Sequence, residues 1–316
     1  MATASPDARE ARALGAVRRW RESDLWYSFT RSPLAVLAAL VTLAFFLGAG
    51  LAPWVAPHDP FDPATLSLLD AFTPPLWRDG GNPDYLLGTD DQGRDILSTI
   101  MYGARISLQV GFASVILAMA IGVTLGLLSG YAGGLIDTVI MRVADVQLSF
   151  PAILIALLVD GVARALLPRS AHEDMALYVL ILSIGASTWV QYARTVRGST
   201  MVERNKEYVQ AARIIGINPV AIMLRHVLPN VLGPVLVIAT IGLALAIITE
   251  ATLSFLGVGV PPTQPSLGTL IRIGNDFLFS GEWWITVFPG LALVLLVLSV
   301  NLLGDWLRDA LNPRLR

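Results

Sequence analysis

The sequence contains no cysteine and only one lysine, Lys206, among its 316 residues. Without cysteine, the chain can form neither a disulfide framework nor a thiolate metal site. ATP hydrolysis of the P-loop class needs a glycine-rich phosphate-binding loop that ends in a lysine, and no such loop precedes Lys206. The sequence therefore excludes a P-loop ATPase.

Histidines and charged residues are also scarce. The three histidines, His58, His172 and His226, are scattered along the chain, and no serine or paired carboxylate is placed to act with them. We expect a non-catalytic chain with no metal, no cofactor of its own and no nucleic-acid partner. Only 15% of the residues are charged, against about a quarter in soluble domains, and the mean hydropathy is +0.64. This balance indicates a protein embedded in lipid.

Long apolar runs predict helices that span a membrane. Crossing the hydrocarbon layer of roughly 30 Å takes about 20 consecutive apolar helical residues. Four uncharged runs reach this length and a fifth is just long enough: Leu34–Ala56, Ile106–Leu128, Val227–Thr249, Trp283–Gly304 and Met175–Ala193. A sixth helix is expected over Thr138–Val159, although only 14 residues between Asp145 and Asp160 are uncharged. The sequence therefore predicts an all-α integral membrane protein with six transmembrane helices.

The positions of the basic residues predict the orientation, because Lys and Arg concentrate on the cytoplasmic side of membrane proteins. With the N-terminus inside, sixteen basic residues fall on the cytoplasmic side and six on the other. We therefore expect both termini in the cytoplasm of a bacterial inner membrane. The segment from Pro57 to Tyr102 then faces outward as an irregular, acidic loop, and Gly257–Glu282 is expected to fold back as a cap.

The segment Glu203–Asn230 is expected to form two short helices joined by a turn. Glu207–Ile215 favours a helix, and Gly216 suits the left-handed position that ends one. Asn218 is a good N-cap, and Pro219 fits the first turn of the next helix.

Two alanines give this loop an unusual first helix. Ala211 and Ala212 leave one flank almost without side chains, so the helix can sit deep in a groove on a partner protein. A surface hairpin that only joins two spans is the alternative interpretation. The segment resembles the EAA loop of binding-protein-dependent ABC importers, where Glu-Ala-Ala is followed by a glycine four residues on and by Leu-Pro at the return to the membrane. The corresponding residues are Gln210-Ala211-Ala212, Gly216 and Leu228-Pro229.

One position departs from the family pattern. Gln210 stands where the family has a glutamate that helps to seat the loop against the ATPase. Either the Gln210 amide substitutes as a hydrogen-bonding group, or Glu207, one helical turn earlier, takes the ionic role. The residues alone leave both options open.

Further motifs narrow the resemblance to the C-type permease subunit of dipeptide and oligopeptide ABC importers, a group that includes nickel, opine and glutathione systems. The matching segments are Ala56-Pro57-His58-Asp59-Pro60, Leu87 to Asp95, Tyr102 to Leu108, Leu253-Ser254-Phe255-Leu256-Gly257 and Asn301 to Asp305. The resemblance implies a MetI-like, type I importer fold. It also implies four kinds of partner: a homologous B-type permease, two ABC ATPase subunits that bind ATP and Mg²⁺, a periplasmic or lipid-anchored binding protein, and membrane lipid.

On this basis the chain divides into a tail, a first helix, an outward loop, a core and a second tail. The expected ranges are a cytoplasmic tail 1–32, a first span 33–56, a periplasmic segment 57–103, an ABC transmembrane domain 104–305 that contains the coupling loop 203–230, and a cytoplasmic tail 306–316.

Three features of the predicted spans have more than a hydrophobic role. Gly122, Gly126 and Gly130 lie on one helical face, which favours close helix contact in lipid, within the chain or with the second permease. Glu250 is an ionisable group in an apolar run and either makes a structural hydrogen bond or lines the pathway as a gate. Arg142 and Asp145 are expected to pair locally.

The substrate is not readable from the residues, and peptides are the leading expectation, ahead of nickel chelates, opines or glutathione. A secondary transporter driven by an ion gradient is the alternative from another class. Such a transporter usually has midplane carboxylates, interrupted helices and internal repeats, and only Glu250 is a candidate here. An assembly subunit without a pathway is a further alternative.

Overall fold

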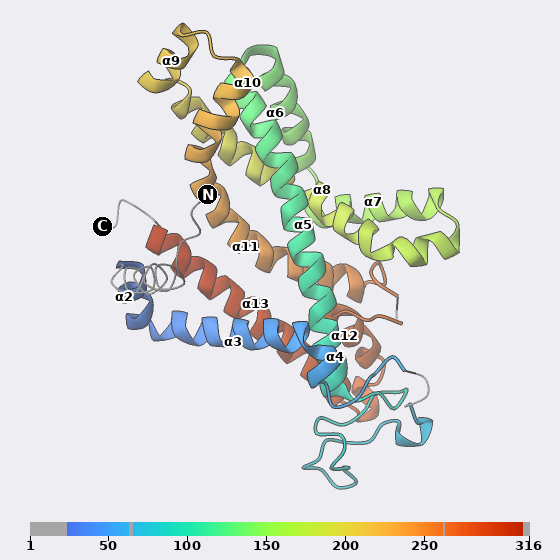
Figure 1. Ribbon diagram of the computed structural model, residues 1–316. Helices are drawn as coiled ribbons and strands as arrows, with labels where there is room; N and C mark the ends of the chain where they lie inside the picture. Colours follow the sequence, from blue (N-terminus) through green and yellow to red (C-terminus); the bar gives the residue numbers. More distant parts are fainter. Residues whose placement is uncertain (1–23, 63–65, 262, 312–316) are drawn as a thin grey trace, which may run out of the picture.

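The computed structural model describes residues 24–62, 66–261 and 263–311, and every regular element in these ranges is helical (Figure 1). Most of the predicted basic N-terminal tail and the last residues of the C-terminal tail lie outside the described residues. Five described helices are long and apolar enough to cross a membrane. A sixth span depends on a bent pair of helices, α6 and α7.

The first span is α3, Pro33–Gly50, which follows the short α2, Asp24–Arg31, and precedes α4, Ala52–Val55. Ser32 caps α3 by accepting a hydrogen bond from the backbone N–H of Ala35. Small residues of α3 face the protein, whereas its leucines are exposed. The inward residues are Ala35, Ala38, Thr42 and Ala49, and the outward ones are Leu34, Leu37, Leu40, Leu43 and Leu47. This division suits a helix that packs closely on one side and meets lipid on the other.

The expected outward loop is irregular and is held by buried polar contacts. It contains one turn of 3-10 helix, Leu68–Asp70. Arg94 Nε donates to Asp90 Oδ2 at 2.6 Å, and both side chains are almost completely buried. Trp284 Nε1 donates to the Thr89 carbonyl at 3.1 Å, which fastens the loop to the last span.

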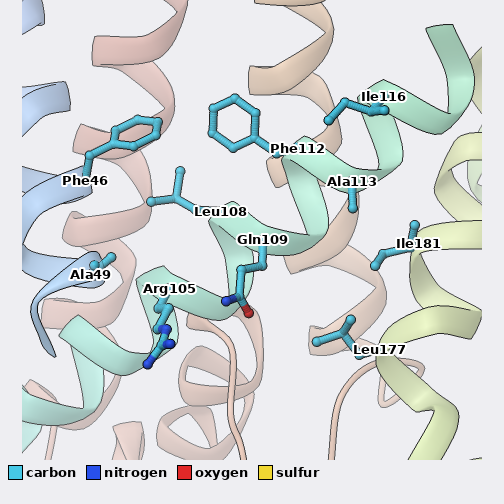
Figure 2. Close-up of a pocket in the computed structure, with 11 residues that line it drawn as sticks. Phe46, Ala49, Arg105, Leu108, Gln109, Phe112, Ala113, Ile116, Leu177 and Ile181 are labelled. Atoms are coloured by element: carbon cyan, nitrogen blue, oxygen red, sulfur yellow. The ribbon is translucent and has the colours of Figure 1, made fainter. Parts of the chain in front are cut away.

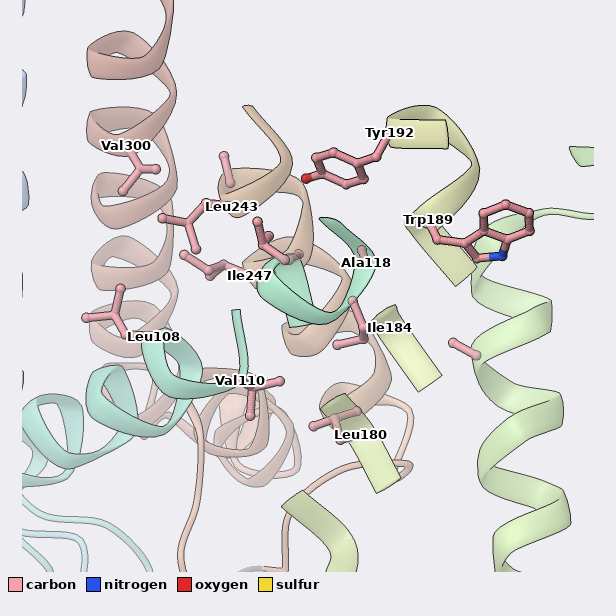
Figure 3. Packing of buried hydrophobic residues seen from close by; sticks show 14 of the residues in the cluster. Leu108, Val110, Ala118, Leu180, Ile184, Trp189, Tyr192, Leu243, Ile247 and Val300 are labelled. Atoms are coloured by element: carbon pink, nitrogen blue, oxygen red, sulfur yellow. The ribbon is translucent and has the colours of Figure 1, made fainter. Parts of the chain in front are cut away.

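The centre of the molecule is the pair α5, Ile96–Ala132, and α8, Arg169–Glu203. Asp95 caps α5 by accepting from the Ser98 N–H, so the helix begins before the predicted span at Ile106. At 1.5 Å per residue, the 37 residues of α5 extend roughly 55 Å, well beyond the hydrocarbon layer. Figure 3 shows its buried side chains meeting those of neighbouring helices, including Ile184, Leu243 and Ile247.

The expected helix over Thr138–Val159 is wrong as a single straight element. The structure has α6, Gly134–Leu148, and α7, Ala152–Leu166, with a bend of 95° between them. The break falls at Ser149, Phe150 and Pro151. Proline lacks the N–H that would continue the helix, and it disfavours the helical conformation of the residue before it.

The second half of the chain continues through α9, Glu207–Ile214, α10, Pro219–Ile222, and a π-helical turn, Met223–Val227, into α11, Leu228–Phe255. Two more elements, α12, Leu267–Asn275, and the 3-10 turn Leu278–Ser280, precede the last helix, α13, Trp284–Leu311.

The connection that contains α12 folds back onto the bundle, as its length suggested. Close backbone approaches fix it there: a Cβ added to Gly268 would lie 2.4 Å from the Ala251 oxygen, and one on Gly274 would lie 2.6 Å from Ile285. The start of α5, α12 and the start of α13 gather at one end of the bundle, whereas α9 lies at the opposite end (Figure 1).

Candidate functional site

The loop between α8 and α11 forms the two short helices that its sequence predicts. Gly216 has φ +83°, and the N–H of Ile217 donates back to the Ala212 carbonyl at 3.1 Å, which closes the end of α9. The Asn218 side chain accepts from the Val220 N–H at 2.8 Å, and Pro219 is the first residue of α10. Leu228 and Pro229 are the first two residues of α11.

The outer face of α9 is apolar and exposed. Val209 and Ala212 are turned into the protein, whereas Ala211 is exposed, so the two alanines face different ways. At the end of the helix, Ile214 is 87% and Ile215 is 78% exposed. Two large aliphatic side chains beside an alanine, at the tip of a short projecting helix, form a surface suited to a partner's groove.

The two polar candidates in this loop differ in their surroundings. Gln210 Nε2 donates to the Asn205 carbonyl at 3.0 Å, so its amide is already engaged within the loop. Glu207 is exposed in the first turn of α9, and within the described residues it makes no hydrogen bond or ion pair. Glu207 therefore has its whole carboxylate free for a partner, whereas Gln210 has one amide N–H engaged and keeps its other N–H and its Oε1 free.

Side chains that the sequence reasoning missed attach α9 to the bundle. Arg213 Nε donates to the Tyr131 hydroxyl at 3.3 Å, and its guanidinium lies 4.8 Å from the centre of that ring. Tyr208 contacts Glu203 and Asn230, and its ring stacks on that of His226. A tyrosine in a short polar loop was the available signal, because its hydroxyl can both donate and accept a hydrogen bond.

Glu250 is fully buried inside the chain, where it joins two helices. Its carboxylate accepts from the Ser107 hydroxyl on α5 and from the Ser254 hydroxyl one turn along α11, both at 2.7 Å. Ser107 in turn accepts from the backbone N–H of Leu267, the first residue of α12, at 3.3 Å. Of the two roles considered for Glu250, this geometry favours the structural hydrogen bond.

The three glycines of α5 pack against α8 of the same chain. A Cβ on Gly122 would lie 2.6 Å from the Trp189 oxygen, one on Gly126 would lie 2.4 Å from the Ala193 oxygen, and one on Gly130 would lie 2.8 Å from the Arg197 oxygen. The stripe therefore brings the backbones of two spans together, which is the internal contact of the two alternatives.

Comparisons with known proteins agree with this arrangement. The sequence model of the binding-protein-dependent transport system inner membrane component matches residues 122–316. The chain belongs to this family. A second model, the N-terminal transmembrane domain of oligopeptide transport permease C, matches residues 19–75.

Curated relatives in the family match almost end to end. The chain is 41% identical to the dipeptide transport system permease protein DppC of Haemophilus influenzae, over 93% of this chain and 95% of that one. It is 39% identical to the di/tripeptide transport system permease protein DppC of Pseudomonas aeruginosa, over 93% and 92%. The protein is therefore a multi-pass inner membrane permease of an ABC importer, a class that works with a second permease and with ATPase subunits.

Solved structures support the fold. Two inward-facing crystal forms of the MetNI methionine ABC transporter align with a TM-score of 0.52 over 68% of this chain and 96% of theirs. Their sequence identities are 19% and 22%, so the likeness is evidence for the fold only. The predicted MetI-like architecture is confirmed.

The ion pairs of this permease differ from the expected local one. Asp145 pairs with Arg194 of α8 at 2.7 Å rather than with Arg142. Asp137 is bound by Arg197, whose Nη2 donates to Oδ2 at 2.7 Å. Both pairs join α6 to α8, because the bend after α6 lays this helix along the charged end of α8.

A hollow of about 680 Å³ lies between α3, α5 and α8 (Figure 2). Its walls are mainly apolar, with Phe46 and Phe112 in edge-to-face contact, and Arg105 and Gln109 are its polar members. Glu250 is not among the residues that line it. Arg105 and Gln109 distinguish this face from the leucine face of α3.

Proposed function

We propose that this chain is the C-type permease subunit of an ATP-driven importer for dipeptides and oligopeptides, and that it is not itself catalytic. ATP and Mg²⁺ would bind to the partner ATPase subunits. The names of the relatives in two organisms support peptides as the substrate class. Nickel chelates, opines and glutathione remain the alternatives within the same machinery, and the family match argues against an ion-driven carrier.

The exposed face of α9 is the observation that carries the proposal. Ala211, Ile214 and Ile215 give α9 a slim apolar edge that projects from the bundle. We infer that it enters a groove on an ATPase subunit, with Glu207 as the main polar contact because its exposed carboxylate is charged and free, whereas one N–H of the Gln210 amide is bonded within the loop. The loop would then carry the force of ATP-driven closure into the spans.

The predicted orientation in the membrane indicates where the remaining partners would bind. The excess of basic residues supports cytoplasmic termini and a cytoplasmic α9. A binding protein, periplasmic or lipid-anchored, would then meet the loop before α5 and the segment around α12. We infer that the hollow beside Arg105 and Gln109 is covered by the second permease, because a lipid-facing surface would disfavour both side chains.

Reconstitution of the permease pair, the ATPases and the binding protein into liposomes tests the proposal. We expect uptake of a radiolabelled dipeptide that requires internal ATP and the binding protein, and that survives collapse of ion gradients. Uptake that persists without ATP and stops when the gradients collapse would establish the ion-driven alternative. ATP-dependent uptake of nickel chelates or glutathione, but not of peptides, would reassign the substrate.

A further inference from the structure

One oxygen atom of the loop, the hydroxyl of Tyr208 on α9, contacts the ends of two other helices. Tyr208 belongs to the first turn of α9, and its O–H donates to Glu203, the last residue of α8. Asn230, in the first turn of α11, donates from Nδ2 to the same hydroxyl at 3.1 Å. The ends of two spans therefore meet at a side chain of the helix that lies between them.

The neighbouring groups define the two side-chain hydrogen bonds of this hydroxyl, and the His226 carbonyl is a more distant acceptor at 3.3 Å. Asn230 Nδ2 also donates to the His226 carbonyl at 2.7 Å, so both protons of the amide are used. Glu203 is buried and accepts a second contact from Lys206 Nζ at 2.9 Å. Partial burial and the bond to Glu203 raise the pKa of Tyr208 to about 12, so the phenol remains a donor at physiological pH.

The other attachments of α9 are less directional. Val209 and Ala212 are buried through apolar contacts. Such contacts oppose separation of the helix from the bundle, but because they are non-directional they oppose its sliding or rotation only weakly. Arg213 and Tyr131 meet at an exposed site on the side of α5. A hydrogen bond to a carboxylate is both stronger and more directional than these contacts.

We propose that Tyr208 is the positioning residue that makes α8 and α11 follow α9 when α9 is displaced. The inference rests on the proposed contact of α9 with an ATPase. Without the hydroxyl, α9 could shift on its apolar contacts while the two spans stay behind. ATP would then be hydrolysed without a matching movement of the pathway.

Tyr208→Phe removes the oxygen and keeps the ring that stacks on His226. In proteoliposomes with binding protein and dipeptide, we expect about tenfold less peptide imported per ATP hydrolysed, with ATPase activity within about twofold of wild type. Tenfold corresponds to about 1.4 kcal/mol, which is of the size expected for the loss of one hydrogen bond to a charged group. Tyr178→Phe, which alters an exposed tyrosine at the other end of α8, is the matched control and should retain the wild-type ratio.

A double-mutant cycle separates this role from a general loss of structure. Glu203→Gln keeps an acceptor but removes the charge, so alone it should lower the ratio about two- to threefold, and combined with Tyr208→Phe it should add nothing further. If Tyr208→Phe fails to assemble, Glu203→Gln and an Asn230→Leu variant provide the same readout. A normal import ratio in either assembled single variant of Tyr208 or Glu203, or fully additive losses, would overturn the inference.

A crosslink separates failure of this inference from failure of the proposed function. Because the chain has no cysteine, Ala211→Cys introduces one reporter on the exposed face of α9. A crosslink from Cys to the ATPase that persists in Tyr208→Phe, together with the reduced import ratio, supports the positioning role. The same crosslink with a normal ratio refutes the role of Tyr208 alone, whereas no crosslink in the otherwise unaltered complex refutes the contact with the ATPase and the inference with it.

Discussion

The contact between α5 and α8 yields the sharpest stability prediction. A Cβ on Gly126 would lie 2.4 Å from the Ala193 oxygen and 2.9 Å from Val196 Cβ. The nearest neighbour is backbone, which cannot rotate away, so α8 would have to move. Gly126→Ala is therefore an overpacking substitution within the α5–α8 contact, the most extensive contact between helices in the described part of the chain.

The expected cost can be worked out from two opposing effects. Overpacking costs about 1–3 kcal/mol, and an immovable backbone neighbour points to the upper end. Alanine recovers about 1 kcal/mol of helix propensity. We expect Gly126→Ala to lower the free energy of unfolding by about 2 kcal/mol, and Gly126→Leu to prevent assembly.

Gly198 provides a matched control on α8, because nothing lies within 4 Å of a Cβ added there. Gly198→Ala should be neutral or slightly stabilising for the same propensity reason. Thermal unfolding of the purified complex in detergent, followed by loss of the monodisperse species, provides the measurement. If Gly126→Ala proves as stable as Gly198→Ala, the two backbones are not in the close contact described above.

Substitutions at three other positions test separate parts of the arrangement. Glu250→Ala should destabilise the complex by about 2–4 kcal/mol, measured by the same assay, because it leaves a cavity and unpaired buried hydroxyls; Glu250→Gln should keep normal uptake, and a loss of uptake in a stable Glu250→Gln complex would revive the gate. Arg197→Ala should cost about 1–2 kcal/mol of stability, since its pair with Asp137 is only partly exposed to solvent, and exchange of the two charges should restore part of it. Ile214→Asp should lower the affinity for the ATPase at least tenfold in a pull-down without changing the stability of the permease, and unchanged binding would remove Ile214 from the interface.

Local sequence signals were sufficient for much of the fold and of the loop. The uncharged runs located the spans, because the cost of unsatisfied backbone groups in lipid leaves few alternatives to a helix. Gly216, Asn218 and Pro219 behave as their backbone preferences dictate, since turns and caps depend on neighbouring residues alone. The single helix expected over Thr138–Val159 is wrong because its hydrophobic pattern continues through Pro151, whereas the proline itself breaks the helix.

Contacts between distant segments were beyond such reasoning. Spacing along one helix predicts a pair between Asp145 and Arg142, whereas in the structure the partner of Asp145 is Arg194 on α8. The contacts of Tyr208 could not be predicted for the same reason, because its partners Glu203 and Asn230 lie at opposite ends of the loop. The opposite orientations of Ala211 and Ala212 likewise depend on how α9 lies against the bundle.

These contacts together imply how the subunit would move. The glycine stripe holds α5 to α8, and Glu250 with Ser107 holds α11 and α12 to α5, so these four helices form one stiff body. Close-packed interiors move between discrete arrangements rather than deforming continuously. A pull on α9 would then be absorbed mainly where attachment is weakest, at the sliding contacts of α9 itself, unless a directional bond prevents it. The hydroxyl of Tyr208 is placed at that point, which explains why its loss should reduce coupling more than stability.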